Sequence, residues 1–213
     1  MMHSGTTVAF ASEMRPLFRL QPPQVDEAAL AELVTFGWAA GRLSNCKGIE
    51  RLPGGTLVTV PLAGGVPSER RYCDPLETLH RDPEMNRADA EEQVYEALEK
   101  SVKVHLASDV GYAMQLSGGV DSSLVAALAQ EETAGSLSSF AVSLGDHPYD
   151  EGRYRDMVVQ RYGLDHHEVA VSAADYASAL PRAVRHMEGP LPHGGCVTLM
   201  LLCERIRKHT KVV

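Results

Sequence analysis

The sequence predicts an α/β protein built around a parallel sheet, and three observations point to it. From about residue 87 onward, predicted strands alternate with predicted helices, which is the pattern of β-α-β units with right-handed crossovers. A glycine loop at residues 117–120 joins one such strand to the helix that follows it. The first 75 residues differ, because their short strand-like pieces are separated by Gly and Pro. We therefore expect two regions, 1–75 and 76–213, of which the second holds the parallel sheet.

Short elements are expected in the first region. Apolar residues recur at helical spacing after Asp26, whose side chain is placed to cap the helix. Two alternating segments flank a glycine-rich turn and favour a pair of strands. The expected elements are a strand at 8–11, one or two helical turns at 13–19, a helix at 26–38 and paired strands at 56–60 and 69–73.

Longer elements are expected in the second region. Val94, Leu98, Val102 and Leu106 form one stripe of a long helix. Pro181 should kink or break a later helix, because proline lacks the backbone N–H that a helix interior needs. The expected helices are 88–106, 121–130, 151–162, 172–187 and 198–208, and the expected strands are 112–116, 139–144, 166–171 and one that begins at 211–213.

Composition narrows the class of protein. Hydrophobic residues make up 44% and charged residues 23% of the 213 residues, as in ordinary globular proteins. The formal net charge of -8 makes a nucleic-acid partner unexpected, and no apolar run approaches the roughly 20 residues that span a bilayer. The first residues lack the pattern of a secretory signal. The four cysteines, Cys46, Cys73, Cys196 and Cys203, are far apart. We expect reduced thiols in a cytoplasmic protein without a disulfide framework.

The strongest chemical signal is the glycine loop, which reads Leu-Ser-Gly-Gly-Val-Asp-Ser-Ser from Leu116 to Ser123. Two glycines let the backbone turn tightly and approach an anion, and the following helix N-terminus points its amides at the same place. No lysine lies in the loop, so it is not a Walker loop. Asp121 would repel a bare phosphate, but a carboxylate beside a phosphate is favourable when Mg²⁺ bridges the two. The other interpretation is a plain strand-to-helix turn in which Asp and Ser act as caps.

The segment from Ser117 to Ser122 resembles the pyrophosphate loop of the ATP pyrophosphatase superfamily. Its surroundings resemble one member, the glutamine-dependent asparagine synthetase family. Three further segments follow the loop in that family's order, namely 140–144 (FAVSL), 149–154 (YDEGRY) and 162–169 (YGLDHHEV). Three earlier segments resemble the end of that family's glutaminase domain, namely 10–17 (FASEMRPL), 48–55 (GIERLPGG) and 71–74 (RYCD).

This resemblance implies a function and a site. It implies that the loop binds the β- and γ-phosphates of ATP, that Mg²⁺ lies at Asp121, and that adenine lies near Leu116 and Val142. A carboxylate would be adenylated and ammonia, drawn from glutamine, would displace AMP to form an amide. The residues so assigned to ATP are Leu116, Ser117, Gly118, Gly119, Asp121, Ser122, Ser123 and Val142; no catalytic residue is assigned.

The resemblance also implies a partial enzyme. We expect residues 1–75 to be the C-terminal remnant of an α+β glutaminase-like domain, and residues 76–213 to be the first part of the ATP pyrophosphatase domain. The family's nucleophilic cysteine has no counterpart near Met1, and its S-G-E-G-x-D-E signature would follow Val213. We therefore expect an internal fragment that binds ATP weakly at most and makes no amide alone.

Other residues carry weaker expectations. His166 and His167 are adjacent in a strand, so their rings should face opposite sides and not share a metal. Asp150 and Glu151 suit a helix start, although a place near the acceptor is an alternative. The turn-rich segment 188–195 matches a region that lines the acceptor pocket in the family.

Several functions remain open. Aspartate is the first acceptor we expect, with a sugar carboxylate, a β-lactam precursor or a peptide as alternatives. The protein would bind only small molecules, and a homodimer is a further open expectation. The competing classes are a nucleotide-binding module without catalysis and a different pyrophosphatase-type ligase. The segments before the loop argue against the second of these.

Overall fold

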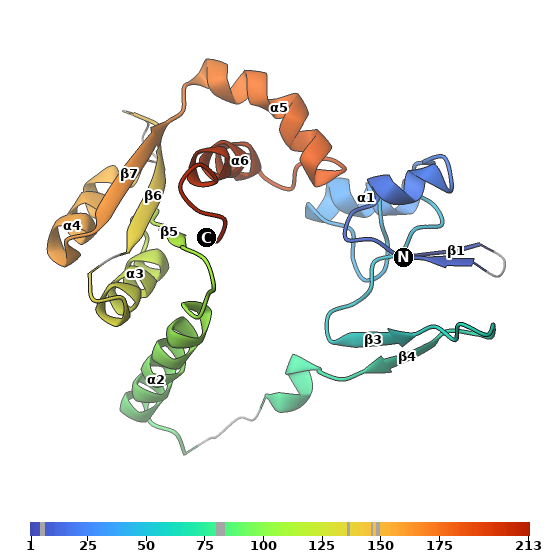
Figure 1. The fold of residues 1–213 in the computed structure, drawn as a ribbon, viewed down its shortest axis with the longest axis horizontal. Helices are drawn as coiled ribbons and strands as arrows, with labels where there is room; N and C mark the ends of the chain where they lie inside the picture. The colour runs from blue at the N-terminus through green and yellow to red at the C-terminus, as the bar shows by residue number, and fades with distance from the viewer. Residues whose placement is uncertain (5–6, 80–83, 136, 146, 148–149) are drawn as a thin grey trace. The chain divides into compact units, whose positions relative to one another are not determined.

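The computed structural model describes residues 1–4, 7–79, 84–135, 137–145, 147 and 150–213. The chain divides into two compact units (Figure 1). Unit 1 comprises Met1–Asp82 and Arg182–His193, and unit 2 comprises Pro83–Pro181 and Gly194–Val213. None of the helices that the structure describes is long and apolar enough to cross a membrane.

Unit 1 is made of short elements, as expected. Two antiparallel pairs, β1 with β2 and β3 with β4, supply its strands. The elements are β1 (Met2–Ser4), β2 (Thr7–Ala9), a 3-10 helix (Arg15–Arg19), α1 (Glu27–Phe36), β3 (Thr56–Thr59), β4 (Ser68–Arg71) and a second 3-10 helix (Pro75–Thr78).

Helix α1 begins where its cap residue predicts. The carboxylate of Asp26 accepts the backbone N–H groups of Ala28 and Ala29 at 3.0 and 3.1 Å, which satisfies donors that have no partner inside the helix. Only part of its apolar stripe is buried: Ala29 and Leu33 are buried, whereas Val34 is 80% exposed. A small cluster of Met2, Leu17 and Ile49 forms the core of unit 1.

Unit 2 holds the alternating elements that were predicted. Helix α5 continues through Pro181, where a kink or break was expected, and the boundary between the units falls at this residue. The elements are α2 (Arg87–His105), β5 (Ala113–Gln115), α3 (Val120–Glu132), β6 (Ser138–Ser143), α4 (Gly152–Tyr162), β7 (Asp165–Ala170), α5 (Ala173–Met187) and α6 (Gly195–Ile206).

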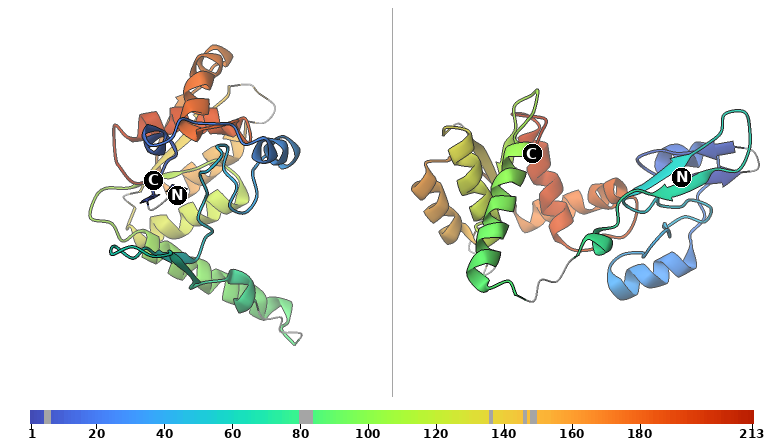
Figure 2. Two further views of the ribbon diagram at one scale, coloured as in Figure 1. Left: turned by 90° about the vertical axis from the view of Figure 1, so that its right-hand side faces the viewer. Right: turned by 90° about the horizontal axis from the view of Figure 1, so that it is seen from below.

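A parallel sheet in the order β5-β6-β7 organises unit 2. The expected last strand is present as a single parallel bridge between Tyr112 and Val212, beside which the N–H of Ala113 donates to the carbonyl of Val212 at 3.0 Å. Helix α6 covers one face of the sheet, while α3 and α4 cover the other (Figure 1). Helix α2 packs beside α3, as both views of Figure 2 show. The sequence's α/β prediction is thus confirmed for this part of the chain.

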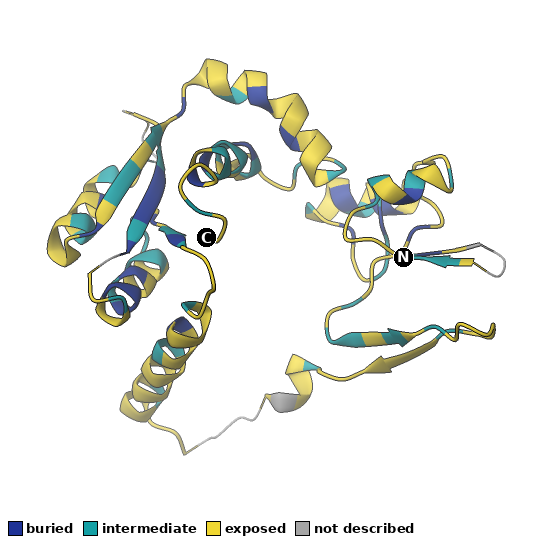
Figure 3. Cartoon of the chain, in the orientation of Figure 1, coloured by how far each residue is buried: buried dark blue, intermediate teal, exposed yellow. Residues whose placement is uncertain are grey.

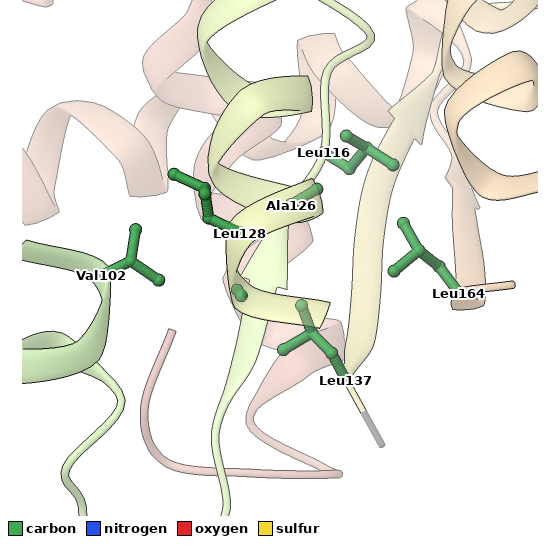
Figure 4. Packing of buried hydrophobic residues seen from close by; sticks show 7 residues of the cluster. Val102, Leu116, Ala126, Leu128, Leu137 and Leu164 are labelled. Carbon is green, nitrogen blue, oxygen red and sulfur yellow. The ribbon is translucent and has the colours of Figure 1, made fainter. Parts of the chain in front are cut away.

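Two hydrophobic clusters fill the two faces of this sheet. On the α3 side the cluster draws on α2, on α3 and on the residues that flank the three strands, and its members surround Ala126 and Leu128 of α3 (Figure 4). On the α6 side Phe140 packs with Ala113, Leu202 and Ile206. Strand β6 is therefore covered on both faces (Figure 3), as expected for the middle strand of a parallel sheet. The middle strand of the sheet, buried at Ser139–Ala141, thus lies beside the start of the loop.

Candidate functional site

The glycine loop lies at the carboxyl end of β5, where open α/β sheets bind ligands. Leu116 is 1% exposed and donates its N–H to the carbonyl of Phe140 at 2.9 Å, which fixes the start of the loop to β6. Gly118 then takes a φ of +101°, a conformation that a residue with a Cβ rarely adopts. The chain turns at this glycine and enters α3 at Val120.

The first turn of α3 leaves its backbone donors available. Its cap residue is Gly119, and none of the described side chains caps the helix, whereas α1 and α2 are capped by Asp26 and Asn86. The N–H groups of a first helical turn lack intrahelical acceptors and carry a positive partial charge. This end of α3 is therefore suited to an external anion such as a phosphate.

Serine hydroxyls stabilise the loop itself. Ser117 Oγ accepts the N–H of Gly119 at 3.1 Å and contacts Ser122 Oγ at 2.9 Å. Ser122 and Ser123 donate their hydroxyls to the carbonyl of Gly119 at 3.2 and 2.7 Å. These hydrogen bonds within the loop stabilise its turn locally.

Two cavities flank the loop, and they divide the predicted site residues. A cavity of about 250 Å³ is lined by Leu116, Ser117 and Val142, together with residues of α4 and α6. A cavity of about 670 Å³ is lined by Asp121 and Ser122, together with apolar residues of α2 and the chain end. The predicted adenine contacts therefore share one cavity, and the predicted metal ligand Asp121 faces the other.

The start of α4 forms a wall of the smaller cavity, and one member of this wall, Arg155, was not predicted. Asp150, Glu151 and Arg155 line it, and Thr198 and Leu199 of α6 lie opposite. Asp150 and Glu151 were expected at a helix start, with a place near the acceptor as the alternative, and they precede α4. Arg155 carried no sequence signal of this kind, because an arginine in a polar helix is normally exposed to solvent. Tyr149, part of the same segment, lies outside the described residues.

Glu151 brings a second carboxylate to the loop. A Cβ built on Gly119 would lie 3.8 Å from Glu151 Oε2. Asp150 instead has a local role, since it accepts the N–H groups of Leu144 and Gly152 at 2.6 and 2.7 Å. Burial opposes the charge on Asp150, but these two bonds and the Arg155 guanidinium outweigh it and hold the pKa of Asp150 below its usual value.

The residues at the loop fit a magnesium ion of the kind that bridges carboxylate and phosphate. Asp121 is exposed and, with the hydroxyls nearby, offers the hard oxygen ligands that Mg²⁺ prefers. Among the described residues there is no group of three or more His, Cys, Asp or Glu that could hold a metal alone. That is compatible with Mg²⁺, which commonly uses one or two carboxylates plus substrate phosphates and water.

His166 and His167 point to opposite faces of the sheet, as predicted. The His166 ring contacts Ser139 Oγ through Nδ1 at 2.8 Å. Its buried Nε2 has no hydrogen-bond partner among the described residues, and Glu168 Oε1 lies 3.9 Å away. His167 stacks on Phe140 with 4.8 Å between ring centroids. Burial is the main reason that the pKa of His166 is lowered. The two rings cannot share a metal.

Within unit 1, the segment after α5 is anchored by Glu188. Its carboxylate accepts the backbone N–H groups of Met14 and Arg15 at 2.6 and 2.8 Å, and Asn45 Nδ2 donates to its carbonyl at 3.1 Å. Glu188 adopts a φ of +55° in this position. No local sequence pattern predicts this pairing between Arg15 and Glu188, which lie 173 positions apart.

Comparison with known proteins gives this site a context. The family model described as asparagine synthase matches residues 93–213. The glutamine-hydrolyzing asparagine synthetase 1 of Bacillus subtilis (strain 168) is 24% identical over 206 residues, which cover 96% of this chain and 32% of that protein. The carboxyethyl-arginine beta-lactam-synthase of Streptomyces clavuligerus is 31% identical over 145 residues, or 68% of this chain and 27% of that protein.

A solved structure of NMN synthetase from Francisella tularensis matches 48% of this chain and 41% of that chain, with 19% identity and a TM-score of 0.30. The chain spans about a third of the length of the curated relatives that it matches first. The family match covers more than half of the chain and includes the loop, the sheet and helices α3 to α6. The chain therefore belongs to the asparagine synthase family.

Proposed function

We propose that this chain is the nucleotide-binding part of an ATP-dependent amidotransferase. The observation that supports this proposal most directly is the loop between β5 and α3. There a glycine turn and an uncapped helix N-terminus meet beside a cavity lined by Leu116 and Val142. Under this proposal the loop amides bind the phosphates of ATP, and Leu116 and Val142 contact the adenine ring. A carboxylate would be adenylated and then converted by ammonia to an amide.

The chain's residues would act by binding and orienting. The loop amides and Ser117 neutralise and hold the phosphate chain, which favours departure of pyrophosphate. Mg²⁺, held by Asp121, would supply charge neutralisation between that carboxylate and the phosphates. The family match supports this assignment, but the residue roles are our proposal.

We propose aspartate as the acceptor and residues 1–75 as the end of a glutaminase domain. The match to a glutamine-hydrolyzing asparagine synthetase over 96% of the chain supports both. A different acceptor is the second candidate, because the beta-lactam-synthase relative has higher identity over the part it matches. Titrating aspartate and carboxyethyl-arginine separately into the chain with Mg·ATP, followed by ligand-observed NMR, distinguishes the two acceptors.

The nucleotide site is tested by substitution in the loop. Asp121→Ala removes the proposed metal ligand, and Gly119→Val adds a side chain whose Cβ would lie 3.3 Å from Ser117 Oγ. We expect each variant to bind Mg·ATP at least about tenfold more weakly by calorimetry, which corresponds to roughly 1.4 kcal/mol. Asp109→Ala, which removes an exposed carboxylate outside the loop, serves as the control. Equal affinity of the wild type and both loop variants would contradict the site.

A further inference from the structure

A buried arginine lies beneath the start of α4, next to the loop. The Arg155 side chain is 3% exposed. Its Nε donates to Glu168 Oε1 on β7 at 2.9 Å, its Nη2 donates to the same oxygen, and Asp150 Oδ1 lies 3.5 Å from Nη2. A buried cation is costly unless carboxylates compensate its charge. Arg155 is therefore held in one orientation by two acidic partners.

Asp150 transmits this orientation to the main chain. Its Oδ2 accepts the N–H of Leu144 just after β6, and its Oδ1 accepts the N–H of Gly152 at the start of α4. The Arg155 guanidinium thus lies between the Asp150 carboxylate and the Glu168 carboxylate of β7. A partly buried carboxylate that loses its cationic partner is left uncompensated and tends to move. Loss of the guanidinium would therefore loosen the junction between β6, β7 and α4.

The glycine loop rests directly on this junction. A Cβ built on Gly118 would lie 2.8 Å from the carbonyl oxygen of Glu151 and 2.9 Å from the backbone nitrogen of Arg155. The two backbones are therefore in direct contact, with no side chain between them that could absorb a shift. Any displacement of the first turn of α4 moves the surface against which the loop is packed.

We propose that Arg155 is a positioning residue for the phosphate-binding loop. This inference rests on the proposed function, because it concerns how the same site binds a pyrophosphate group. Arg155 acts through Asp150, Glu168 and the first turn of α4. Through these contacts it stabilises the loop conformation in which the backbone amides point toward the bound phosphate. Phosphate binding by several amides depends on their joint placement, so a shift of the loop weakens several contacts at once.

The experiment compares ligands that do and do not need the loop. Mg·ATP and magnesium pyrophosphate engage the proposed phosphate site, whereas AMP lacks the β- and γ-phosphates. In Arg155→Met we expect the affinities for Mg·ATP and pyrophosphate to fall about tenfold, while the AMP affinity measured by ligand-observed NMR falls clearly less, because AMP meets Arg155 only in the wall of the adenine cavity. Arg155→Lys restores the charge without the guanidinium fork and should recover part of the loss. Arg161→Met, exposed on the same helix, is the control.

A second variant covers the case in which Arg155→Met does not fold. Glu168→Gln removes one partner charge from a side chain that is 43% exposed, and we expect the same selective but smaller loss. Parallel weakening of ATP, pyrophosphate and AMP, or unchanged ATP affinity in both variants, overturns the positioning role. If wild-type chain fails to bind Mg·ATP or pyrophosphate, the proposed function itself is wrong, which is a distinct result.

Discussion

At the scale of single residues, Gly118 shows why the loop needs a residue without a Cβ. Its φ of +101° alone disfavours any other residue. The close approach of Glu151 and Arg155 adds a steric reason, because both neighbouring atoms belong to the backbone and cannot move away as a flexible side chain would. The sequence predicted the first reason from the Gly-Gly pair. The second depends on a tertiary contact between the loop and α4.

Replacing Gly118 separates these two costs. Gly163, which has a φ of +63° and nothing within 4 Å of a built Cβ, is the matched control. Gly163→Ala should cost about 1 kcal/mol of unfolding free energy from backbone strain. Gly118→Ala should cost at least about 2 kcal/mol, because overpacking adds to strain. Urea denaturation measures both, and equal losses in the two variants would mean that the contact with α4 is not tight.

At the scale of elements, the order and type of the helices and strands in unit 2 could be predicted from the sequence, because each element depends on local patterns. In unit 1, β1 and the 3-10 helix Pro75–Thr78 were not expected. Asp26 capped α1 as expected, and β6 and β7 fell within a residue of their expected starts. The predicted apolar stripe on α2 is only partly buried, since Val102 is buried but Val94 is 59% exposed. Periodicity shows which side chains share a face and not how far a neighbouring element extends along it.

The polar groups between β6, β7 and α4 could not be predicted in this way. Ser139 of β6 is fully buried against His166 of β7, and Arg155 of α4 is buried against Glu168. A pattern of polar and apolar residues predicts that such side chains face solvent. Their burial is favourable only because hydrogen-bonding partners on neighbouring elements satisfy their polar groups. The unpredicted part of the candidate site therefore lies where strands and helices meet.

This packing predicts a dependence of stability on pH. Around the His166 ring lie Ser139 of β6, Arg155 and Asp156 of α4, and His167 and Glu168 of β7. Burial and the Arg155 charge lower the pKa of His166 in the folded state, so the unfolded chain binds this proton more readily. Stability should therefore fall as pH drops below about 6.5, the unfolded value, and stop falling below the folded pKa.

The measurement is urea denaturation between pH 7.5 and 5.5. His166→Gln stays uncharged and should show a weaker fall, the difference amounting to about 1.4 kcal/mol for each unit by which the pKa is lowered. His105→Gln, at an exposed position on α2, should keep the wild-type dependence. A His166→Gln variant whose stability follows the wild type across this range would show that His166 is not the responsible group.

At the scale of the whole molecule, each unit has a core drawn from its own residues. Met2, Leu17 and Ile49 form the cluster of unit 1, whereas Phe140 belongs to a cluster of unit 2. The predicted boundary at residues 75 and 76 did not anticipate that Arg182–His193 would belong to unit 1. The local sequence pattern changes only once along the chain, near residue 75, so it predicts a single boundary. It does not reveal that a later segment returns to unit 1, because that segment is held by long-range hydrogen bonds such as those of Glu188.

Because each unit has its own hydrophobic core, we expect a core substitution in one unit to destabilise that unit and not the other. Phe140 is 0% exposed, and Phe140→Ala should cost unit 2 about 3–5 kcal/mol. Hydrogen exchange followed by mass spectrometry should show faster exchange in β6 and α3 and unchanged exchange in α1, because each cluster stabilises only the backbone that packs around it. Leu17→Ala is the reciprocal control and should accelerate exchange in unit 1 alone. Loss of protection in both units from either substitution would show that the chain unfolds as one cooperative body.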